Sequence, residues 1–407
     1  MQITLKTLTP LWTGGVDQTC DRLHETGLIG SLRWWYEALV RGLGGYACDP
    51  TSEDPQARCE FDAKAYEQVK KDGKSEAEAI NAGLHRVCPV CYVFGTTGWA
   101  RLFQLRAIKV PTTPLHFRTT LKMNQGWLKR VFGGENQNID SLQAPYGELR
   151  FQFIPRRHDT DYAKSQFALI LHIAAQHGGI GARLQHGFGQ FVFPPELGEI
   201  TLEEGLQDLQ AKIQKGVLRS SGLAVDTPFD LRNFVSLTYE IPRTRLDAFT
   251  RDQAHIGKAD KKSENRYIPC AFDLRYKGTG NLGMRQWLKK GKGWKETTNP
   301  EQLEELDLLL GPRSQWGKGK NQRRIDDDFR TASRVFFGMP YLKQGSQDTY
   351  ILRVWAFWPP ELKSRLATPQ DLKALLDGYV QHVFGKEAKK VLETLGEDIL
   401  QVVGGGK

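Results

Sequence analysis

Short runs of alternating apolar and polar residues are the main pattern in the first half of the chain. They predict strands over residues 1–11, 100–110 and 148–155. Between these runs, apolar residues at helical spacing predict a helix over 31–40, which Ser31 caps, and another that ends at His177. Residues 188–193 follow as a mostly apolar strand. The order strand, helix, strand, strand, helix, strand predicts a ferredoxin-like β-α-β-β-α-β unit with insertions.

The second half repeats this pattern less regularly. Strands are predicted over residues 233–241, 334–339 and 350–358, and an amphipathic helix over 372–384. A helical segment at 202–217 and a boundary near 220–228 separate the two halves. We therefore predict an α+β protein with two ferredoxin-like domains, residues 1–220 and 221–407, of which the second is more degenerate.

Three long segments interrupt the predicted sheets. Residues 46–91 are rich in Lys and Glu and contain four cysteines, which is typical of an inserted segment. Residues 112–146 are polar and rich in turn residues, and we expect them to form an arm that reaches a partner. Residues 243–330 are weakly periodic and contain clusters of basic residues, so the second domain is predicted to hold a long basic insertion.

The composition narrows the class of protein. With 407 residues, 40% hydrophobic and 25% charged, the chain resembles an ordinary globular protein of about two to three domains. It has no apolar run long enough to cross a membrane and no N-terminal leader, so we expect a cytoplasmic protein without a membrane partner. The formal net charge of +9 favours a polyanionic partner such as nucleic acid, although solubility alone also explains such an excess.

The cysteines are the clearest candidates for a metal centre. Six cysteines without a secretory signal favour metal binding over disulfides. The spacing of Cys88 and Cys91 in CPVC lets two thiolates bind one tetrahedral zinc ion. Cys48 and Cys59 supply the other predicted ligands of a structural zinc, with His85 as a possible replacement for one of them. Reduced thiols without a metal remain the alternative.

A glycine-rich loop between the second helix and the last strand is the first candidate for binding an anion. Its residues Gly181, Gly187 and Gly189 permit close backbone approaches, and Arg183 and His186 project from it. Such a loop can place its N–H groups along a phosphodiester backbone. A simple tight connection is the alternative. The HGFGQFVF segment approaches an RNA-recognition strand pattern, but its glutamine shifts the aromatic residues, so we expect those to pack in the core.

Basic residues elsewhere suggest contacts with nucleic acid. Arg33 is predicted in the first turn of a helix, where a cation opposes the helix dipole and an anionic ligand would explain it. Lysines at 289–295 lie among Trp287 and Trp294, a mixture that suits phosphates and stacked bases. The same mixture recurs around Trp316, and the candidate RNA-binding residues there are Arg313, Lys318, Lys320, Arg323 and Arg324. A solvated, partly disordered loop is the alternative.

Four motifs together resemble a known family: LKTLTPLWTGG, ETGLIGSLRWWYEALVRG, CPVCYVFGTTGWARLFQL and GGIGARLQHGFGQF. They are similar to motifs of the RAMP superfamily of CRISPR proteins. More narrowly, they resemble the first-numbered subunit type of the type III-B, or Cmr, effector complex. The resemblance covers most of residues 1–193 and is weaker beyond residue 220. It implies a subunit of an RNA-guided complex for antiviral defence, placed at the end opposite the guide's 5′ tag.

The resemblance also implies roles for single residues. Gly181, Gly187 and Gly189 match the family's glycine-rich loop, whose backbone is expected near RNA. Arg33 matches a basic position that contacts the guide backbone. Cys88 and Cys91 match the paired cysteines of a metal-binding insertion in related proteins. The aspartates at positions 17 and 21 lie where other subunits keep an RNA-cleaving aspartate, and we assign them no role.

The leading hypothesis is a non-catalytic subunit that binds single-stranded guide or target RNA together with other RAMP subunits. RNA would be held mainly through phosphates and ribose, with little reading of base edges. One alternative is a metal-independent endoribonuclease of the same superfamily that uses His24, His177 or His186 as general acid and base. A protein scaffold whose basic loops bind acidic subunits is the other.

Overall fold

The structure is a computed structural model of the whole chain. It describes residues 1–14, 20, 22–121, 139–156, 158–223, 227, 229–252, 256–259, 271–276, 283–298, 302–312, 315–316, 323–324 and 331–401. The side chains of 113–121, 139–143, 250–252, 256–259, 272–273, 276, 315–316 and 323–324 are outside this description. Among the described residues, no helix is both long and apolar enough to span a membrane.

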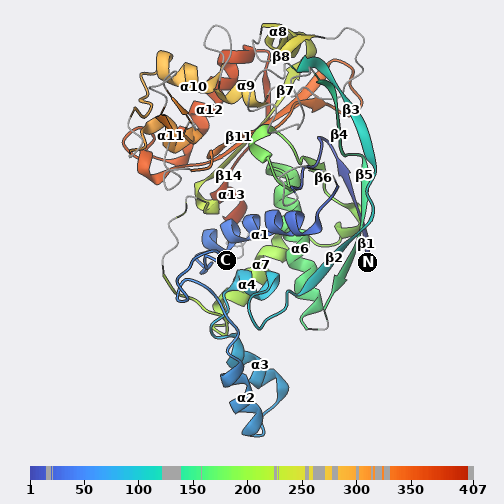
Figure 1. The fold of residues 1–407 in the computed structure, drawn as a ribbon, viewed down its shortest axis with the longest axis vertical. Helices are drawn as coiled ribbons and strands as arrows, with labels where there is room; N and C mark the ends of the chain where they lie inside the picture. The colour runs from blue at the N-terminus through green and yellow to red at the C-terminus, as the bar shows by residue number, and fades with distance from the viewer. Residues whose placement is uncertain are drawn as a thin grey trace.

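The first antiparallel sheet is built from the N-terminal part of the chain. Its strands, in the order β2-β5-β1-β6, are β2 (Phe103–Lys109), β5 (Glu148–Pro155), β1 (Gln2–Thr7) and β6 (Phe191–Val192). Helices α1 (Glu25–Gly42) and α6 (Thr160–His177) cover one face of this sheet, as Figure 1 shows. The alternation that predicted the strands places Ile3, Leu5 and Phe151 in the core between sheet and helices.

The second antiparallel sheet is built from the C-terminal part. Its strands, in the order β11-β13-β7-β14, are β11 (Val335–Phe337), β13 (Thr349–Phe357), β7 (Phe234–Pro242) and β14 (Lys389–Leu395), and β12 (Tyr341–Leu342) also pairs with β13. Helix α12 (Pro369–Phe384) packs on it through Leu372, Leu376 and Tyr379. Both sheets place their first and third main strands inside and the second and fourth at the edges.

Shorter helices and strands connect these layers. The helices are α7 (Leu202–Gln214), α8 (Arg243–Asp252), α9 (Ala271–Tyr276), α10 (Met284–Gln286), α11 (Glu305–Leu310) and α13 (Gly396–Gln401), with single turns at Leu184–His186, Pro195–Leu197, Leu231–Asn233, Trp287–Gly291 and Pro360–Leu362. The two-residue strands β9 (Gln315–Trp316) and β10 (Arg323–Arg324) pair with each other. Helix α7 confirms the helix that was predicted over 202–217, although it ends at Gln214.

Helix α1 starts earlier than the sequence predicted. It begins at Glu25, so Ser31 lies inside the helix and is not its cap. The residue before the helix is His24, whose side chain makes no capping bond. The helix continues through Gly27 and Gly30 because Leu28 and Ile29 extend its buried face. The predicted cap was therefore wrong, and so was the placement of Arg33 in the first turn.

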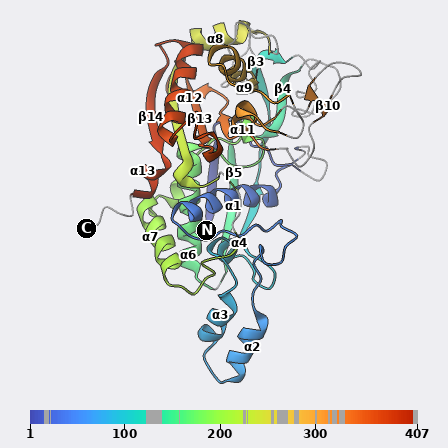
Figure 2. The same ribbon diagram turned by 90° about the vertical axis from the view of Figure 1, so that its left-hand side faces the viewer.

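The cysteine-containing insertion folds into three helices. Helices α2 (Ala63–Lys71) and α3 (Glu76–Leu84) form a hairpin that projects from the rest of the protein in both views (Figures 1 and 2). The short helix α4 (Pro89–Phe94) then returns the chain to the core. No residue of α2 is buried, whereas α3 buries Ala79, Gly83 and Leu84, so the apolar packing of the hairpin comes from α3.

The polar arm is a β-hairpin. Strand β3 (Thr112–Leu121) pairs with β4 (Ile139–Pro145), and on its other edge with β8 (Ile256–Ala259) from the C-terminal part. The arm therefore has regular secondary structure in its described residues, and its contact with a partner stays a prediction. Residues 122–138 lie outside the described part.

Two tryptophans of the basic insertion, Trp287 and Trp294, contact other residues of the protein. Trp294 is buried, and Trp287 packs against Tyr379 and His382 with ring centroids 5.4 and 5.8 Å apart. The buried ring of Trp294 is therefore not available to stacked bases, whereas Trp287 is half-buried and its role in base stacking stays a prediction. The lysine at position 289 pairs with Glu296 at 2.6 Å.

Candidate metal centre and nucleic-acid interface

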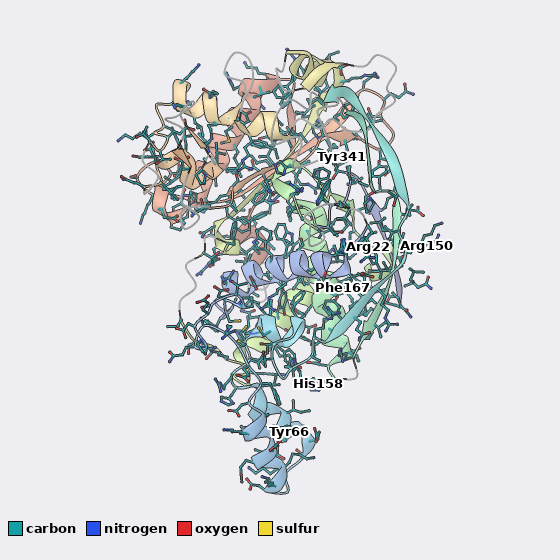
Figure 3. The ribbon with its side chains drawn as sticks, in the orientation of Figure 1. Arg22, Tyr66, Arg150, His158, Phe167 and Tyr341 are labelled. Carbon is teal, nitrogen blue, oxygen red and sulfur yellow. The ribbon has the colours of Figure 1, made fainter. Side chains whose placement is uncertain are left out.

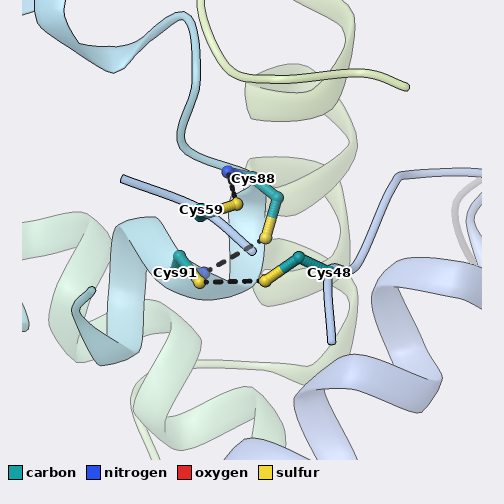
Figure 4. Close-up of side chains that lie close together, drawn as sticks. All are labelled: Cys48, Cys59, Cys88 and Cys91. Atoms are coloured by element: carbon teal, nitrogen blue, oxygen red, sulfur yellow. Dashed lines mark hydrogen bonds between the residues drawn. The ribbon is translucent and has the colours of Figure 1, made fainter. Parts of the chain in front are cut away.

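Four buried cysteines meet at the base of the α2–α3 hairpin. One sulfur from each of Cys48, Cys59, Cys88 and Cys91 lies within 4.8 Å of the others. The sulfurs of Cys48 and Cys91 are 3.4 Å apart, and Figure 4 shows all four side chains converging. Four thiolates around zinc, each at about 2.3 Å, fill a tetrahedron of similar size. The site can therefore hold a metal ion, as the CPVC spacing predicted.

The local sequence explains how α4 presents two of these sulfurs. Cys88 is the N-cap of α4, and Pro89 occupies the first turn, where a missing N–H costs nothing. The Cys88 sulfur accepts from the Cys91 N–H at 3.5 Å, and the Cys59 sulfur accepts from the Cys88 N–H at 3.2 Å. Gly95, with a φ of 88°, ends the helix. These N–H groups favour negatively charged sulfur.

The hydrogen-bonding partners of each thiol set its pKa. Burial raises the pKa of Cys88, but hydrogen bonds from Cys48, Cys59 and Cys91 outweigh it and lower that pKa well below its usual value. Hydrogen bonding to the other cysteines raises the pKa of Cys91. The four thiols therefore titrate as an interacting group, in which the protonation of each depends on the others.

His85 is not a ligand in this arrangement. Its ring Nδ1 bonds to the carbonyl oxygen of Ala82 at 2.7 Å, and its side chain is exposed beside Asp62. The four cysteines alone form the cluster, so the alternative in which His85 replaces one of them is wrong. Cys20 also lies outside the cluster.

Arg33 connects helix α1 to the metal centre. Its guanidinium donates to the Cys91 sulfur at 3.3 Å, to the Gly95 carbonyl at 3.4 Å and to the Glu37 carboxylate at 2.9 Å. Burial alone would lower the pKa of Arg33, but Cys91 and Glu37 raise that pKa by more than burial lowers it. The net pKa lies above its usual value, so Arg33 remains protonated. The partners of this cation thus lie within the protein. Sequence reasoning missed the Cys91 contact because nothing local to position 33 marks it.

We expect Arg33→Glu to destabilise the protein. The new carboxylate would face Glu37 and the cysteine sulfurs, and leaving such half-buried charges unpaired costs about 3 kcal/mol. A residue whose only role is to contact the guide backbone would instead lose RNA affinity on this change without loss of stability. Thermal unfolding compared with Arg33→Lys, which keeps the charge but not the guanidinium geometry, measures the effect. A melting temperature equal to wild type would leave RNA contact as the better explanation of Arg33.

The glycine-rich loop uses many of its backbone N–H groups within the protein. Ile180 donates to the Gly189 carbonyl at 2.9 Å, Ala182 to the Trp12 carbonyl at 2.7 Å and Gly189 to the Pro10 carbonyl at 2.8 Å. The loop therefore lies directly beside the segment that follows β1, and backbone hydrogen bonds join the two. These three donors are not directed at solvent, which favours the tight-connection alternative for this part of the loop.

Each of the three predicted glycines is required by close backbone packing. Gly181, Gly187 and Gly189 all have φ near +90°. A Cβ would meet the carbonyl oxygen of Trp12 at Gly181, the backbone of Met339 at Gly187 and the carbonyl oxygen of Ile180 at Gly189. Sequence reasoning identified the right glycines, and the structure supplies a packing reason for them. Their contact with RNA stays a prediction.

The loop also docks on the second sheet. Met339 donates its N–H to the Gly187 carbonyl at 3.1 Å, and the buried Arg353 guanidinium donates to the Gly178 carbonyl at 3.0 Å. The side-chain amide of Gln190 donates to the Met339 carbonyl at 2.9 Å. The glutamine that breaks the RNA-recognition pattern thus joins the two halves of the protein. Phe191 is buried, which confirms the expected core packing.

The basic and imidazole side chains near this loop differ in exposure. Arg183 is half-buried, with its guanidinium 4.9 Å from the ring centroid of Trp12, and His186 is half-buried in the following turn. His177 is buried, and its pKa falls to about 3 because burial and the nearby Arg353 cation both disfavour the imidazolium. The three predicted histidines do not share one environment.

The remaining predicted residues are only partly described. Arg323 and Arg324 form strand β10, paired with Trp316 and Gln315. Arg313, Lys318 and Lys320 lie outside the described residues, as do Asp17 and Asp21. The RNA-binding role of this basic segment stays a prediction.

Two antiparallel sheets, a packed glycine loop and a buried four-cysteine centre define a mixed α+β protein with a candidate metal centre. The family model described as RAMP superfamily matches residues 4–192, which include the first sheet, the cysteine insertion and the glycine loop. Residues 4–192 are therefore similar to the RAMP superfamily, the family that the four motifs resemble.

Solved structures with low similarity span nearly the whole chain. Cmr1 from Pyrococcus furiosus in its apo form is 14% identical, with a TM-score of 0.38 over 99% of this chain and 95% of that chain. A chain in the cryo-EM structure of the Type III-B Cmr-beta complex bound to cognate target RNA is 11% identical, with a TM-score of 0.38 over 95% and 98%. TM-scores this low do not establish a shared fold. No curated protein sequence matches the chain.

Proposed function

We propose that this chain is a non-catalytic RNA-binding subunit of a type III-B CRISPR ribonucleoprotein. It binds guide or target RNA at one end of a cytoplasmic complex, next to other RAMP subunits, and helps to capture target RNA in antiviral defence. The RAMP superfamily match over residues 4–192 carries the proposal. The CPVC and glycine-loop motifs narrow it to the Cmr-type subunit, and the net charge of +9 suits a polyanion.

In this proposal the two sheets are two ferredoxin-like units, residues 1–220 and 221–407. Their equivalent strand orders, β2-β5-β1-β6 and β11-β13-β7-β14, support this duplication. The first unit has α1 and α6 in the two helical positions of a β-α-β-β-α-β motif, and α12 occupies the second position in the other unit. The glycine loop then serves as the joint between them.

The metal in this proposal is a structural zinc. Four thiolates are a soft, closed ligand set that leaves no position for a water or substrate, which is typical of structural zinc sites. Arg33 donates to one thiolate and offsets part of the negative charge of such a centre. The ion would fix both connections of the α2–α3 hairpin, since Cys59 precedes α2 and Cys88 follows α3.

The burial of His177 supports the non-catalytic assignment. A general acid or base must reach the substrate and titrate near the working pH. His177 is 3% exposed and its pKa is about 3, so it does neither. An endoribonuclease would have to depend on His24 and His186 without it.

We expect a gel-shift assay to show that the purified chain binds labelled single-stranded RNA and leaves it intact. Affinity should fall steeply with salt, because phosphate contacts release counterions. Matched single-stranded DNA and a denaturing gel of the recovered RNA complete the assay, in buffers with and without EDTA. Defined RNA fragments would favour the endoribonuclease. Absence of any shift, at low salt and high protein concentration, would contradict an RNA-binding role for the isolated chain.

A further inference from the structure

The face of the first sheet that points away from α1 and α6 is polar and basic. We call it the outer face and define it by the exposed side chains of β1, β2, β5 and β6: Gln2, Lys6, Arg106, Ile108, Lys109, Glu148, Arg150, Gln152 and Val192. Figure 3 shows Arg150 projecting from the side of the sheet opposite to the helices. In β1, β5 and β6 the intervening inward residues are buried, so the strand period gives the side of each exposed residue; in β2 the period holds as far as Arg106, and the side of Lys109 follows from its position opposite Arg150.

The strand register brings the cations of this face together. Lys109 of β2 lies directly opposite Arg150 of β5, and Arg106 lies opposite Gln152. A register shift between Ala107 and Lys109 re-aims the end of β2 so that Lys109 joins the outer face. On the next strand, β1, Lys6 lies opposite Glu148 of β5 in the strand register. Glu148 is the one carboxylate among the outer-face residues.

The arrangement costs stability in the isolated protein. Like charges on directly opposed strand positions repel each other, and Lys109 and Arg150 occupy such positions. Among the described residues neither of them forms an ion pair within 4 Å. Exposed cations of the second sheet are arranged differently: Lys390 pairs with Glu393 at 2.7 Å and Lys343 with Glu240 at 2.6 Å.

The side chains of the outer face favour a nucleic-acid strand as its ligand. The four cations lie on three neighbouring strands, β2, β5 and β1, which are about 4.8 Å apart, so they form a band across the sheet that an extended nucleic-acid strand can follow with its phosphates. Two exposed apolar residues, Ile108 and Val192, flank the cations and offer contact to ribose or base. The outer face has no aromatic side chain among its described residues, so base stacking is not part of this contact.

We propose that the outer face of the first sheet binds the phosphate backbone of single-stranded RNA, with Lys109 and Arg150 as its centre and Lys6 and Arg106 beside them. This inference rests on the proposed RNA-binding function and assigns it a surface different from the glycine loop. Binding would neutralise the repulsion between Lys109 and Arg150 and would depend little on base sequence.

The test compares the full-length double variant Lys109→Gln/Arg150→Gln with a control, Lys363→Gln/Lys386→Gln, which removes two exposed charges elsewhere. The probe is a fluorescein-labelled, unstructured single-stranded RNA, and fluorescence anisotropy gives Kd across a salt series. We expect the outer-face variant to bind at least about tenfold more weakly at low salt, with the slope of log K against log salt reduced by about 1.4. The control should change much less.

Stability separates binding from folding in the same variants. Because the substitution removes a repulsion, the outer-face variant should melt at or above the wild-type temperature while its RNA affinity falls. Equal affinities of the outer-face variant and the control, with wild type binding RNA, would overturn the outer-face site and leave the proposed function standing. Failure of wild type to bind RNA would overturn both.

Discussion

Replacing Cys91 with serine is expected to release the metal and to destabilise the base of the α2–α3 hairpin. Cys91 supplies one of four sulfurs that lie within 4.8 Å of one another. A structural zinc contributes its binding free energy to folding, so losing it should lower the free energy of unfolding by about 4 kcal/mol or more. Elemental analysis should find about one zinc per wild-type chain and a much lower content in the variant.

The effect should be concentrated in the hairpin and α4. Helix α2 buries no residue and is held by exposed contacts with α3, such as Lys70 to Glu76, so the two connections that the cysteines join contribute much to its position. Hydrogen exchange is expected to increase across α2, α3 and α4, while the strands of the second sheet keep their protection. Cys20→Ser is the matched control, because Cys20 is a half-buried cysteine outside the cluster.

Two results would contradict the metal centre. Wild-type protein purified without chelator could contain no zinc or other transition metal. Alternatively, Cys91→Ser and Cys20→Ser could have the same stability and the same exchange pattern. Either result would favour reduced, unliganded thiols, the alternative that the sequence left open.

Patterns that depend on neighbouring residues predicted the fold well. The alternation over 148–155 gave the bounds of β5, and helix α6 ends at His177 as expected. The CPVC spacing predicted a pair of converging sulfurs because both residues lie within one turn of α4. In each case the information lies within a few residues of the chain.

Features set by distant partners were not predictable in the same way. Strand β14 was not predicted, because its exposed and polar residues carry little alternation and its pairing with β7 defines it. The contact between Arg33 and Cys91 joins positions far apart in sequence. Helix α1 also began earlier than expected, because Leu28 and Ile29 are buried against parts of the protein that are distant in sequence.

The glycine loop shows both sides of this limit. Its glycines signal unusual backbone conformations, and three of them have φ near +90°. The sequence does not show what they pack against, and Met339 of the second half is among the neighbours. A glycine without a Cβ allows close approach of either an RNA strand or another part of the protein. The sequence therefore does not distinguish RNA contact from internal packing, whereas the structure shows the internal packing directly.

Gly189→Ala should therefore destabilise the protein strongly, whatever its effect on RNA. The φ of +83° is unfavourable for alanine, and the new Cβ would collide with the carbonyl oxygen of Ile180. The collision involves backbone that is also held by the hydrogen bond from Ile180 N–H to the Gly189 carbonyl. We expect a loss of about 3 kcal/mol or more, measured by urea unfolding.

Gly216→Ala isolates the conformational part of this effect. Gly216 has a φ of +68°, but a Cβ there would meet nothing within 4 Å. Its substitution should cost only about 1 kcal/mol, the penalty of the left-handed conformation alone. If Gly189→Ala cost no more than Gly216→Ala but abolished RNA binding by folded protein, the glycine would serve RNA and not packing. A larger loss of stability, with unchanged affinity of the folded fraction, would instead establish the loop as the joint between the two sheets.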